Sequence, residues 1–278
     1  MTERFTRLNA RFPRKRAFIT GAGSGLGLAL AKALAADGWT LGLFDRNLER
    51  LTTVEAQLAD AGVRLIAYPG DVTHADELTV AINSFAATHD GLDLMINNAG
   101  VAGTGALMEV SLEDWRWIID INVMGVVHGS RAAIPHLQRN GTGLLINVAS
   151  AAAFASAPGM VSYNATKAAV VSISETLVNE LRSAGIQVSV VMPSFFQSGL
   201  LETLRGPEYS RAFAHKLMQK SEYSAEDIAR DALTEAANGS VYIVLPRAAR
   251  TMWRFKRWMP LRFLGRVAAL AQQRSSLK

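Results

Sequence analysis

Cysteine is absent from all 278 residues of this sequence. Its absence excludes disulfides, thiolate metal sites and thiolate nucleophiles, and it suits a reducing compartment. The sequence also lacks an uninterrupted apolar run of about eighteen residues, and residues 1–20 lack the apolar stretch of a secretory signal. We therefore expect a cytoplasmic protein whose chain does not cross a membrane.

Two catalytic signatures are missing as well. No histidines have the spacing H-E-x-x-H or a comparable ligand spacing, so we expect no catalytic metal. No serine lies within G-x-S-x-G, which excludes the nucleophile elbow of a hydrolase. The histidines without a ligand spacing are His74, His89, His128, His136 and His215.

Acidic residues are absent from the end of the chain. Residues 247–278 contain nine Lys or Arg and no Asp or Glu, which leaves 20 basic and 24 acidic residues elsewhere. The net charge of +5 therefore combines a mildly acidic body with a basic tail. Because 49% of the residues are hydrophobic and no repeat or linker divides the chain, we expect one domain over residues 14–246, preceded by an arm, 1–13, and followed by the tail, 247–278.

Short runs rich in β-branched residues alternate with longer segments whose apolar residues recur at i, i+3 and i+4. Seven such alternations predict an α/β fold, a doubly wound seven-stranded parallel sheet of the Rossmann type with helices on both faces. Ligands of such sheets bind at the carboxyl ends of the strands, near the point where strand order reverses. The predicted strands are residues 16–20, 40–45, 64–71, 92–100, 143–150, 187–193 and 240–245.

Helices are predicted between these strands, the first from about Leu26 to Asp37. Three later helices have an N-cap residue followed three positions later by an acid, a spacing that satisfies free N–H groups of the first turn. These pairs are Thr73 with Asp76, Ser111 with Asp114, and Ser224 with Asp227.

A glycine-rich turn, "TGAGSGLG" (20–27), follows the first predicted strand and opens the first helix. Gly21, Gly25 and Gly27 permit a tight turn, a close approach of the backbone to a pyrophosphate, and close packing of helix on strand. The helix N-terminus adds free N–H groups and the positive end of its dipole for phosphates. The turn therefore predicts a dinucleotide site.

Asp45 ends the second predicted strand, where an acid binds the adenosine ribose. It favours NAD, because a carboxylate repels the 2′-phosphate of NADP. Arg46, the next residue, favours NADP, because its guanidinium can pair with the 2′-phosphate. We expect NAD, with NADP as the alternative.

Tyr163 and Lys167 lie four positions apart in "YNATK", within a segment of helical composition, so they share one helix face and can reach the same ligand. A neighbouring ammonium lowers the pKa of a phenol from about 10. A decrease of three units needs about 4 kcal/mol, which one charge about 4 Å away supplies at an effective dielectric near 20. Such a tyrosine can exchange a proton with a carbonyl or alcohol oxygen while a nicotinamide carries the hydride. Ser150, thirteen residues upstream, can hydrogen-bond the same oxygen.

With these motifs the sequence resembles the short-chain dehydrogenase/reductase family over about residues 14–246. "TGAGSGLG" is similar to the family's cofactor turn, "NNAG" (97–100) to its sheet-stabilising motif, and Ser150 with "YNATK" to its active site. The resemblance implies Asn122, in "INVMG", as a fourth catalytic residue that kinks a helix and holds a water relaying protons to Lys167, which also binds the nicotinamide ribose. The cofactor-binding residues predicted in this way are Gly21, Ser24, Gly25, Leu26, Gly27, Asp45, Arg46, Asp71, Val72, Asn98, Ala99, Gly100, Tyr163, Lys167, Pro193 and Ser198.

The sequence departs from the family pattern after the sixth predicted strand. Pro193 is followed by Ser194 where the family has glycine, which stiffens the loop, and Ser198 replaces a threonine that holds the nicotinamide carboxamide. A serine hydroxyl can make the same bond. Residues 195–223 are expected to form a lid over the substrate. The apolar lid residues, which can line an apolar pocket or pack on the body, are Phe195, Phe196, Leu200 and Leu201.

The basic tail extends beyond the usual end of the family. Pro260 is expected to separate two short helices, and the first has a basic face and an apolar face. Trp253 and Trp258 suit a lipid–water interface. Binding to an anionic membrane surface and packing on the body or a partner subunit both fit this pattern, whereas nucleic-acid binding lacks an accompanying module. The basic face comprises Arg247, Arg250, Arg254 and Arg257, and the apolar face Met252, Phe255 and Met259.

These features together predict an NAD(P)-dependent oxidoreductase that interconverts an alcohol and a ketone or aldehyde, on an apolar or lipid-like small molecule. The resemblance further implies a homodimer or homotetramer formed through the helices that contain Asn122 and Tyr163. Two alternatives are a dinucleotide-sensing protein and a membrane-docking protein of the same fold with little turnover. A complete Ser150, Tyr163 and Lys167 set argues against the sensor, because a sensor needs no proton donor.

Overall fold

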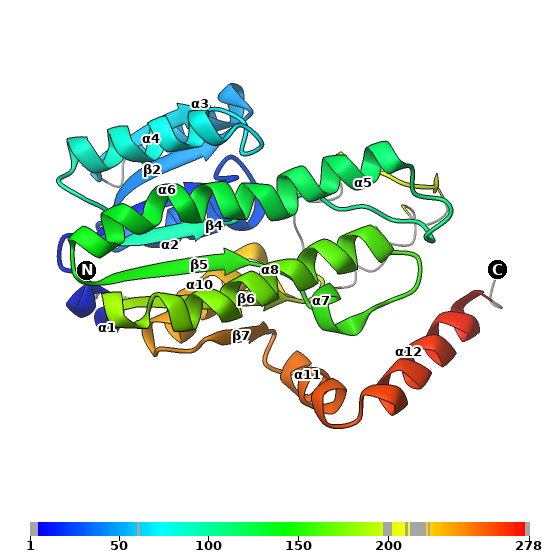
Figure 1. Cartoon of the computed structure of the whole chain (residues 1–278). Coiled ribbons are helices and arrows are strands. Elements are labelled where there is room, and N and C mark those ends of the chain that lie inside the picture. The colour runs from blue at the N-terminus through cyan, green and yellow to red at the C-terminus, as the bar shows by residue number, and fades with distance from the viewer. Residues whose placement is uncertain are drawn as a thin grey trace.

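The computed structural model describes residues 5–59, 62–196, 202–208, 211, 221 and 223–275. Its centre is a seven-stranded parallel sheet with the strand order β3-β2-β1-β4-β5-β6-β7 (Figure 1). The predicted α/β fold of the Rossmann type is therefore confirmed. The strands are β1 Arg16–Thr20, β2 Thr40–Asp45, β3 Leu65–Pro69, β4 Leu94–Asn97, β5 Gly143–Val148, β6 Ile186–Pro193 and β7 Tyr242–Leu245.

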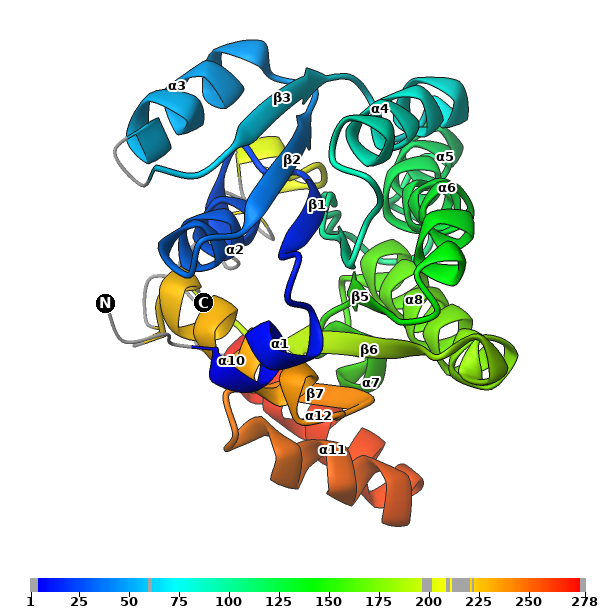
Figure 2. The same cartoon turned by 90° about the vertical axis from the view of Figure 1, so that its left-hand side faces the viewer.

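Helices cover both faces of the sheet (Figure 2). On one side lie α1, α2 and α10, and on the other lie α4, α6 and α8. The main helices are α1 Thr6–Arg11, α2 Gly25–Ala36, α3 Leu48–Leu58, α4 Ala75–Thr88, α5 Leu112–Ile119, α6 Gly125–Arg139, α7 Ala152–Ala155, α8 Val161–Glu180, α10 Ala225–Ala237, α11 Ala249–Trp258 and α12 Pro260–Ser275. A π-helical turn, Asp120–Met124, joins α5 to α6, and a 3-10 turn, Arg182–Ala184, follows α8.

Strand order reverses at β1, which pairs with β2 on one side and with β4 on the other. Three strands end earlier than the sequence pattern predicts: β3 at Pro69, β4 at Asn97 and β5 at Val148. The residues that follow them leave the sheet as loops at its carboxyl edge. These loops surround the position where a ligand is expected.

Buried clusters hold the helices on the sheet, one on each face and a third where α7, α8, α11 and α12 meet. Leu30 and Leu34 of α2 pack with Ile228 of α10 on one face. Ile82 of α4 and Leu137 of α6 pack on the other. Because the inner strands β1, β4 and β5 are covered on both sides, their residues form continuous buried runs instead of alternating with exposed polar ones.

Two of the three predicted helix caps form as expected. Ser111 accepts a hydrogen bond from the backbone N of Asp114, and Ser224 with Asp227 forms a complete capping box. The cap predicted at Thr73 is wrong, because α4 begins one residue later with His74 at the N-cap position. The Thr73 hydroxyl instead donates to Asp71 Oδ1 at 2.9 Å, so it is not available to the helix.

The basic tail forms two helices separated at Pro260, as predicted. Its arginine face is not uniformly solvated, since Arg247 and Arg250 both pair with Glu235 on α10, at 3.2 and 3.0 Å. The two tryptophans also differ: Trp253 is half-buried, whereas Trp258 is exposed.

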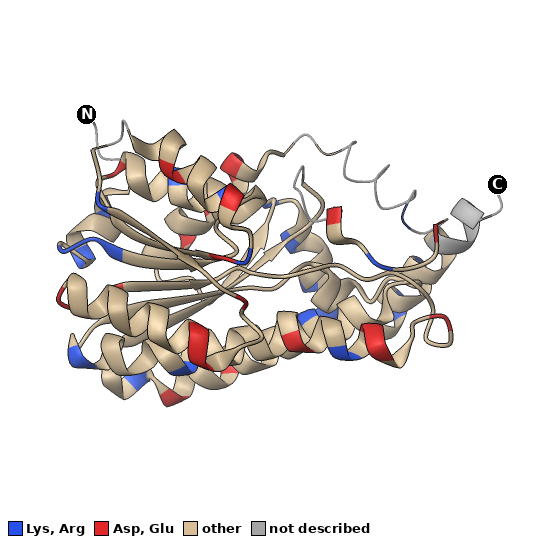
Figure 3. Cartoon of the chain, turned by 90° about the horizontal axis from the view of Figure 1, so that it is seen from above, with Lys and Arg blue, Asp and Glu red and all other residues tan. Residues whose placement is uncertain are grey.

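Charged residues of both signs are interspersed along the helices that cover the sheet (Figure 3). Among the residues whose positions are described, no helix combines the length and apolar character needed to span a bilayer. In the same part of the chain, no group of three or more His, Asp or Glu side chains is placed to hold a metal ion.

The capping box of α10 is expected to contribute measurably to stability. Ser224→Ala removes the acceptor for the Asp227 N–H, bonded at 3.1 Å, and should lower the free energy of unfolding by about 1 kcal/mol in urea titrations. Thr52→Ala, at an exposed position inside α3, is the matched control and should have no such cost. Equal stabilities of the two variants would contradict this role for the cap.

Candidate active site

The glycine turn after β1 has a backbone geometry that residues with a side chain rarely adopt. Gly21 and Gly25 have positive φ angles of 64° and 52°. A Cβ atom on Gly27 would lie 2.0 Å from the carbonyl oxygen of Gly21. Glycine is therefore required for the turn itself at two positions and for helix packing at the third. The resulting cradle, at the N-terminus of α2, fits a dinucleotide pyrophosphate.

Asn98 fastens the cradle to the neighbouring strand. Its Nδ2 donates to the carbonyl oxygens of Thr20 and Gly21, at 3.0 and 3.1 Å, and its backbone N donates to the Thr20 hydroxyl at 3.1 Å. The loop after β4 and the turn after β1 thus hold one another at the point where strand order reverses.

Asp45 lies at the end of β2, beside the glycine turn. Its Oδ2 accepts a hydrogen bond from Gly23 N and its Oδ1 accepts one from Asn47 N, both at 2.9 Å. These bonds fix the carboxylate at the carboxyl end of β2. Arg46 beside it is exposed.

Arg50 is a cleft residue that the sequence reasoning missed. Its guanidinium pairs with Glu202 in the described part of the lid and lies 3.3 Å from the Ser24 hydroxyl at the start of α2. Its position four residues after Arg46 was the available signal, but spacing alone does not show that both arginines line the cleft. The ion pair joins the lid to the cofactor end of the site.

A cleft of about 190 Å³ opens along the carboxyl edge of the sheet. Most residues predicted to bind the cofactor line it. Gly27 does not, because it packs α2 against the turn, and Ser198 lies outside the described residues. The predicted residues that line the cleft are Gly21, Ser24, Gly25, Leu26, Asp45, Arg46, Asp71, Val72, Asn98, Ala99, Gly100, Tyr163, Lys167 and Pro193.

Tyr163 and Lys167 project from the first two turns of α8 into this cleft. Both side chains are buried, at 6% and 4% exposure, and the Lys167 Nζ lies 5.8 Å from the centre of the Tyr163 ring. Lys167 donates a hydrogen bond to the carbonyl oxygen of Val148, at the end of β5, at 3.0 Å. The structure thus brings together the phenol and the ammonium that the sequence placed on one helix face.

The acidity of Tyr163 differs from the expectation. Burial raises the pKa of the Tyr163 phenol, and a hydrogen bond with Ser150 lowers it by less. Burial also lowers the pKa of Lys167, to about 8. The raised pKa of the phenol favours a neutral tyrosine, a form suited to proton donation.

Asn122 lies in the π-helical turn between α5 and α6 and is fully buried. Its Oδ1 accepts from Val101 N at 2.8 Å, and its Nδ2 donates to Val101 O at 2.9 Å and to Thr166 Oγ1 at 3.2 Å. The kinked helix that the resemblance implied is present as this turn. Asn122 does not line the cleft, so the geometry gives it the role of tying the loop after β4 to α8.

The loop after β5 places Ser150 beside Tyr163. The Ser150 hydroxyl lies 3.4 Å from the carbonyl oxygen of Pro193, and it accepts from Ala152 N at 3.1 Å.

The predicted lid residues differ in their surroundings. Phe196 lines the cleft and also packs against the core, so it has both of the roles considered for lid side chains. Phe195 is exposed. Leu200 and Leu201 lie outside the described residues.

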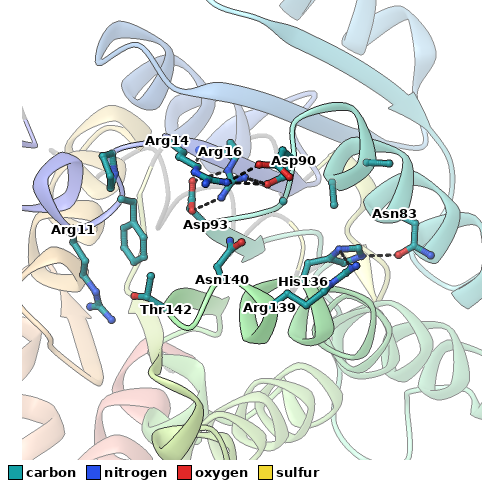
Figure 4. A pocket seen from close by; sticks show the side chains of 15 residues that line it. Arg11, Arg14, Arg16, Asn83, Asp90, Asp93, His136, Arg139, Asn140 and Thr142 are labelled. Atoms are coloured by element: carbon teal, nitrogen blue, oxygen red, sulfur yellow. Dashed lines mark hydrogen bonds and ion pairs between the residues drawn. The ribbon is translucent and has the colours of Figure 1, made fainter.

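A larger hollow, of about 940 Å³, lies at the other edge of the sheet (Figure 4). Its lining includes Arg16 at the start of β1 and Asp93 just before β4, which form a buried ion pair at 2.8 Å. Arg14 pairs with Asp90, also at 2.8 Å. Because its central cations are paired within the chain and ligands of parallel sheets bind at the carboxyl ends, we assign the chemistry to the smaller cleft.

Comparisons with known proteins agree with this geometry. Residues 15–208 match the family model described as short chain dehydrogenase. An uncharacterised oxidoreductase of Staphylococcus aureus (strain MRSA252) is 35% identical over 189 residues, covering 68% of this chain and 81% of the relative. The chain therefore belongs to the short-chain dehydrogenase/reductase family and is an NAD(P)-dependent oxidoreductase.

Solved structures of the family show the same fold with either cofactor. A short-chain dehydrogenase/reductase from Burkholderia phymatum in complex with NAD has a TM-score of 0.83 and 31% identity, covering 87% of this chain and 92% of its own. A short-chain dehydrogenase from Sphingobium yanoikuyae in complex with NADPH has a TM-score of 0.74 and 27% identity, covering 88% and 94%.

The buried ammonium of Lys167 is expected to destabilise the fold at neutral pH. Below pH 8 the folded and unfolded states both carry the proton, so the full cost of burying the charge, about 3 kcal/mol, is present. Between pH 8 and 10.5 the folded state releases the proton first, and the cost disappears. Lys167→Met removes this cost but also the hydrogen bond to Val148, which is worth about 1 kcal/mol. The variant should therefore raise the free energy of unfolding by about 2 kcal/mol at pH 7 and by much less at pH 10.

Urea titrations at the two pH values measure this difference. Lys32→Met, at an exposed site on α2, is the matched control and should change the free energy of unfolding by less than about 0.5 kcal/mol at either pH. The buried-charge explanation is contradicted if Lys167→Met does not raise the free energy of unfolding at pH 7, or if it raises it equally at pH 10.

Proposed function

We propose that this enzyme interconverts a ketone or aldehyde and the corresponding alcohol. The observation that carries this proposal is the buried pair of Tyr163 and Lys167 in the cofactor cleft, with Ser150 hydrogen-bonded to the phenol. A bound nicotinamide cofactor supplies or accepts the hydride. Tyr163 donates the proton to the carbonyl oxygen in the reduction, and Ser150 holds that oxygen by a hydrogen bond.

Lys167 supports this proton transfer in two ways. A pKa of about 8 leaves roughly nine tenths of its ammonium charged at pH 7, so the developing phenolate has a counter-charge. Its bond to Val148 directs the ammonium toward the carboxyl end of β5, where it can also bind a nicotinamide ribose. Asn122 positions the loop that follows β4 and the Thr166 hydroxyl on α8, and a water relay through it remains a prediction.

NAD is the proposed preferred cofactor, with NADP as the alternative. The Asp45 carboxylate is fixed at the adenosine end by two backbone N–H groups and opposes a 2′-phosphate. Arg50 is already paired with Glu202, which leaves Arg46 as the nearby cation that favours NADP.

An apolar carbonyl compound is the proposed substrate. Phe196 lines the cleft, and Leu204 is buried in the described part of the lid. Large apolar side chains over the reaction site favour burial of an alkyl or aryl group of the substrate. In a panel of methyl ketones, each added CH₂ that reaches this region contributes about 0.8 kcal/mol to transition-state binding.

A homo-oligomer is proposed through the helices α6 and α8. The outward face of α8 carries small exposed residues, Ala165, Ala168 and Ser172, which let a second helix approach closely. A contact here would place the helices of Tyr163 and Asn122 next to their counterparts in the partner subunit. The cytoplasmic location also remains a prediction.

Tyr163→Phe tests the proposed proton donor. The variant keeps the ring but loses the hydroxyl, so the turnover rate with an accepted ketone should fall by about 10²- to 10⁴-fold, while the dissociation constant of NADH changes less than about threefold. Tyr242→Phe, which removes a hydroxyl bonded to Glu175 at 2.6 Å outside the cleft, should keep its turnover. Unchanged turnover in Tyr163→Phe would refute the mechanism.

Asp45→Ser tests the cofactor preference. Removing the carboxylate should raise the ratio of kcat/KM for NADPH to that for NADH by at least about tenfold, because repulsion of the 2′-phosphate is lost. Glu226→Gln, which removes one exposed negative charge on α10, should leave the ratio unchanged. A ratio that already favours NADPH in the unmodified enzyme would show that Arg46 outweighs Asp45.

A further inference from the structure

The C-terminal hairpin of α11 and α12 is fixed to the body by one of its faces. Ala249 is buried, and the ring of Trp253 packs on Tyr242 of β7 with centroids 5.1 Å apart. Arg250 pairs with Glu235 at 3.0 Å. The first helix of the hairpin is therefore a structural part of the enzyme and not a free extension.

The second helix is held by the first. Phe263 of α12 is 3% exposed and packs edge-on against Phe255 of α11, with centroids 5.9 Å apart. Val267, one turn later, packs in the same cluster. Because both helices are positioned by aromatic contacts, their remaining faces point in defined directions.

An apolar tip is left uncovered where the two helices meet. We use the name "tip" for residues 258–264. Trp258 is 86% exposed and Leu261 is 82% exposed, and Met259 and Leu264 are also exposed. Leu270 extends the exposed apolar surface along α12. Soluble chains seldom leave several large apolar side chains together in water, so this tip indicates a binding surface.

Basic side chains surround the tip, and three of them are held by aromatic rings. Arg257 lies 5.2 Å from the Trp253 ring centroid, Arg266 lies 4.9 Å from Phe255, and Lys256 lies 5.6 Å from Phe263. Arg254 and Arg262 are exposed. No acidic residue occurs anywhere in residues 247–278, so the sequence provides no local counter-charge for these cations.

We propose that the tip docks on an anionic lipid surface. Exposed tryptophan and leucine side chains can enter the boundary between headgroups and acyl chains, while the surrounding Arg and Lys side chains pair with lipid phosphates. A two-fold contact between two tips is disfavoured, because it would bring the same cluster of positive charges together. The mixture of large apolar and basic groups is complementary to a lipid surface and not to a second copy of itself.

The position of the hairpin connects this surface with the active site. In Figure 1 the strand arrowheads point toward the end of the molecule where α7 and α12 lie, and the turn between α11 and α12 projects away from the sheet. Phe154 of α7, four residues after Ser150, shares a buried cluster with Ala249 and Phe263. Docking through the tip would therefore turn the β7 side of the molecule, with α7 and the neighbouring loop of Ser150, toward the membrane, which suits an apolar substrate; this last step rests on the proposed function.

Vesicle co-sedimentation of the full-length enzyme tests the docking surface. Binding is expected to vesicles of phosphatidylcholine with about 30% phosphatidylglycerol, to weaken at 0.5 M salt, and to be at least tenfold weaker to phosphatidylcholine alone. Arg254→Glu with Arg262→Glu should weaken binding to the anionic vesicles by at least about 25-fold, because each basic residue near the surface contributes about fivefold. Trp258→Ser with Leu261→Ser should also abolish binding.

Two matched double variants control for altered charge and apolarity. Lys32→Glu with Arg182→Glu makes the same change in net charge away from the tail, and Leu48→Ser with Val80→Ser removes exposed apolar side chains on α3 and α4. Both should bind the anionic vesicles as the unmodified enzyme does. NADH oxidation with a soluble ketone should stay unchanged in the tip variants, so a failure of docking can be separated from a failure of the proposed reaction.

Three results would overturn the proposal. The first is equal binding to neutral and anionic vesicles, and the second is equal binding by the tip variants and the unmodified enzyme. The third is a combination of two observations: the unmodified enzyme does not bind vesicles, and a tip variant has a lower molar mass in light scattering. This result would assign the tip to a contact between subunits.

Discussion

Burial of one ammonium group, that of Lys167, sets the conditions for the whole active site. The charge lies at the carboxyl edge of the sheet, bonded to the Val148 carbonyl, where burial lowers its pKa to about 8. Holding it there is unfavourable, so the surrounding core must offset the cost. The long helix α8 accomplishes this by packing on the sheet while its first turns present Lys167 and Tyr163 to the cleft.

The elements around this charge are tied to one another by polar contacts of a few side chains. Asn98 joins the turn after β1 to the loop after β4, and Asn122 joins that loop to α8. A substitution at either position would leave buried backbone groups without partners. The glycine turn and the proton donor are therefore positioned by a single connected network of polar contacts.

The C-terminal hairpin follows the same physical rules with a different result. Its inner side chains meet aromatic partners and Glu235, so they are structural, whereas Trp258 and Leu261 at the tip are more than four fifths exposed. Helical periodicity correctly separated the basic from the apolar positions of α11. It also placed Arg250 and Arg254 on one face, although Arg250 pairs with Glu235 of the body and Arg254 is exposed. Only contact with α10 and β7 distinguishes them.

Local spacing in the sequence determined the strands, the glycine turn, and the sharing of one helix face by Tyr163 and Lys167, because these depend on short-range backbone geometry. The pattern could not show that strands β3, β4 and β5 end early, that Thr73 bonds Asp71 instead of capping α4, or that Arg50 pairs with Glu202. It also predicted an acidic Tyr163, whereas burial raises the pKa of the phenol. Burial and long-range partners decide such properties, and both arise only when distant segments pack together in the tertiary structure.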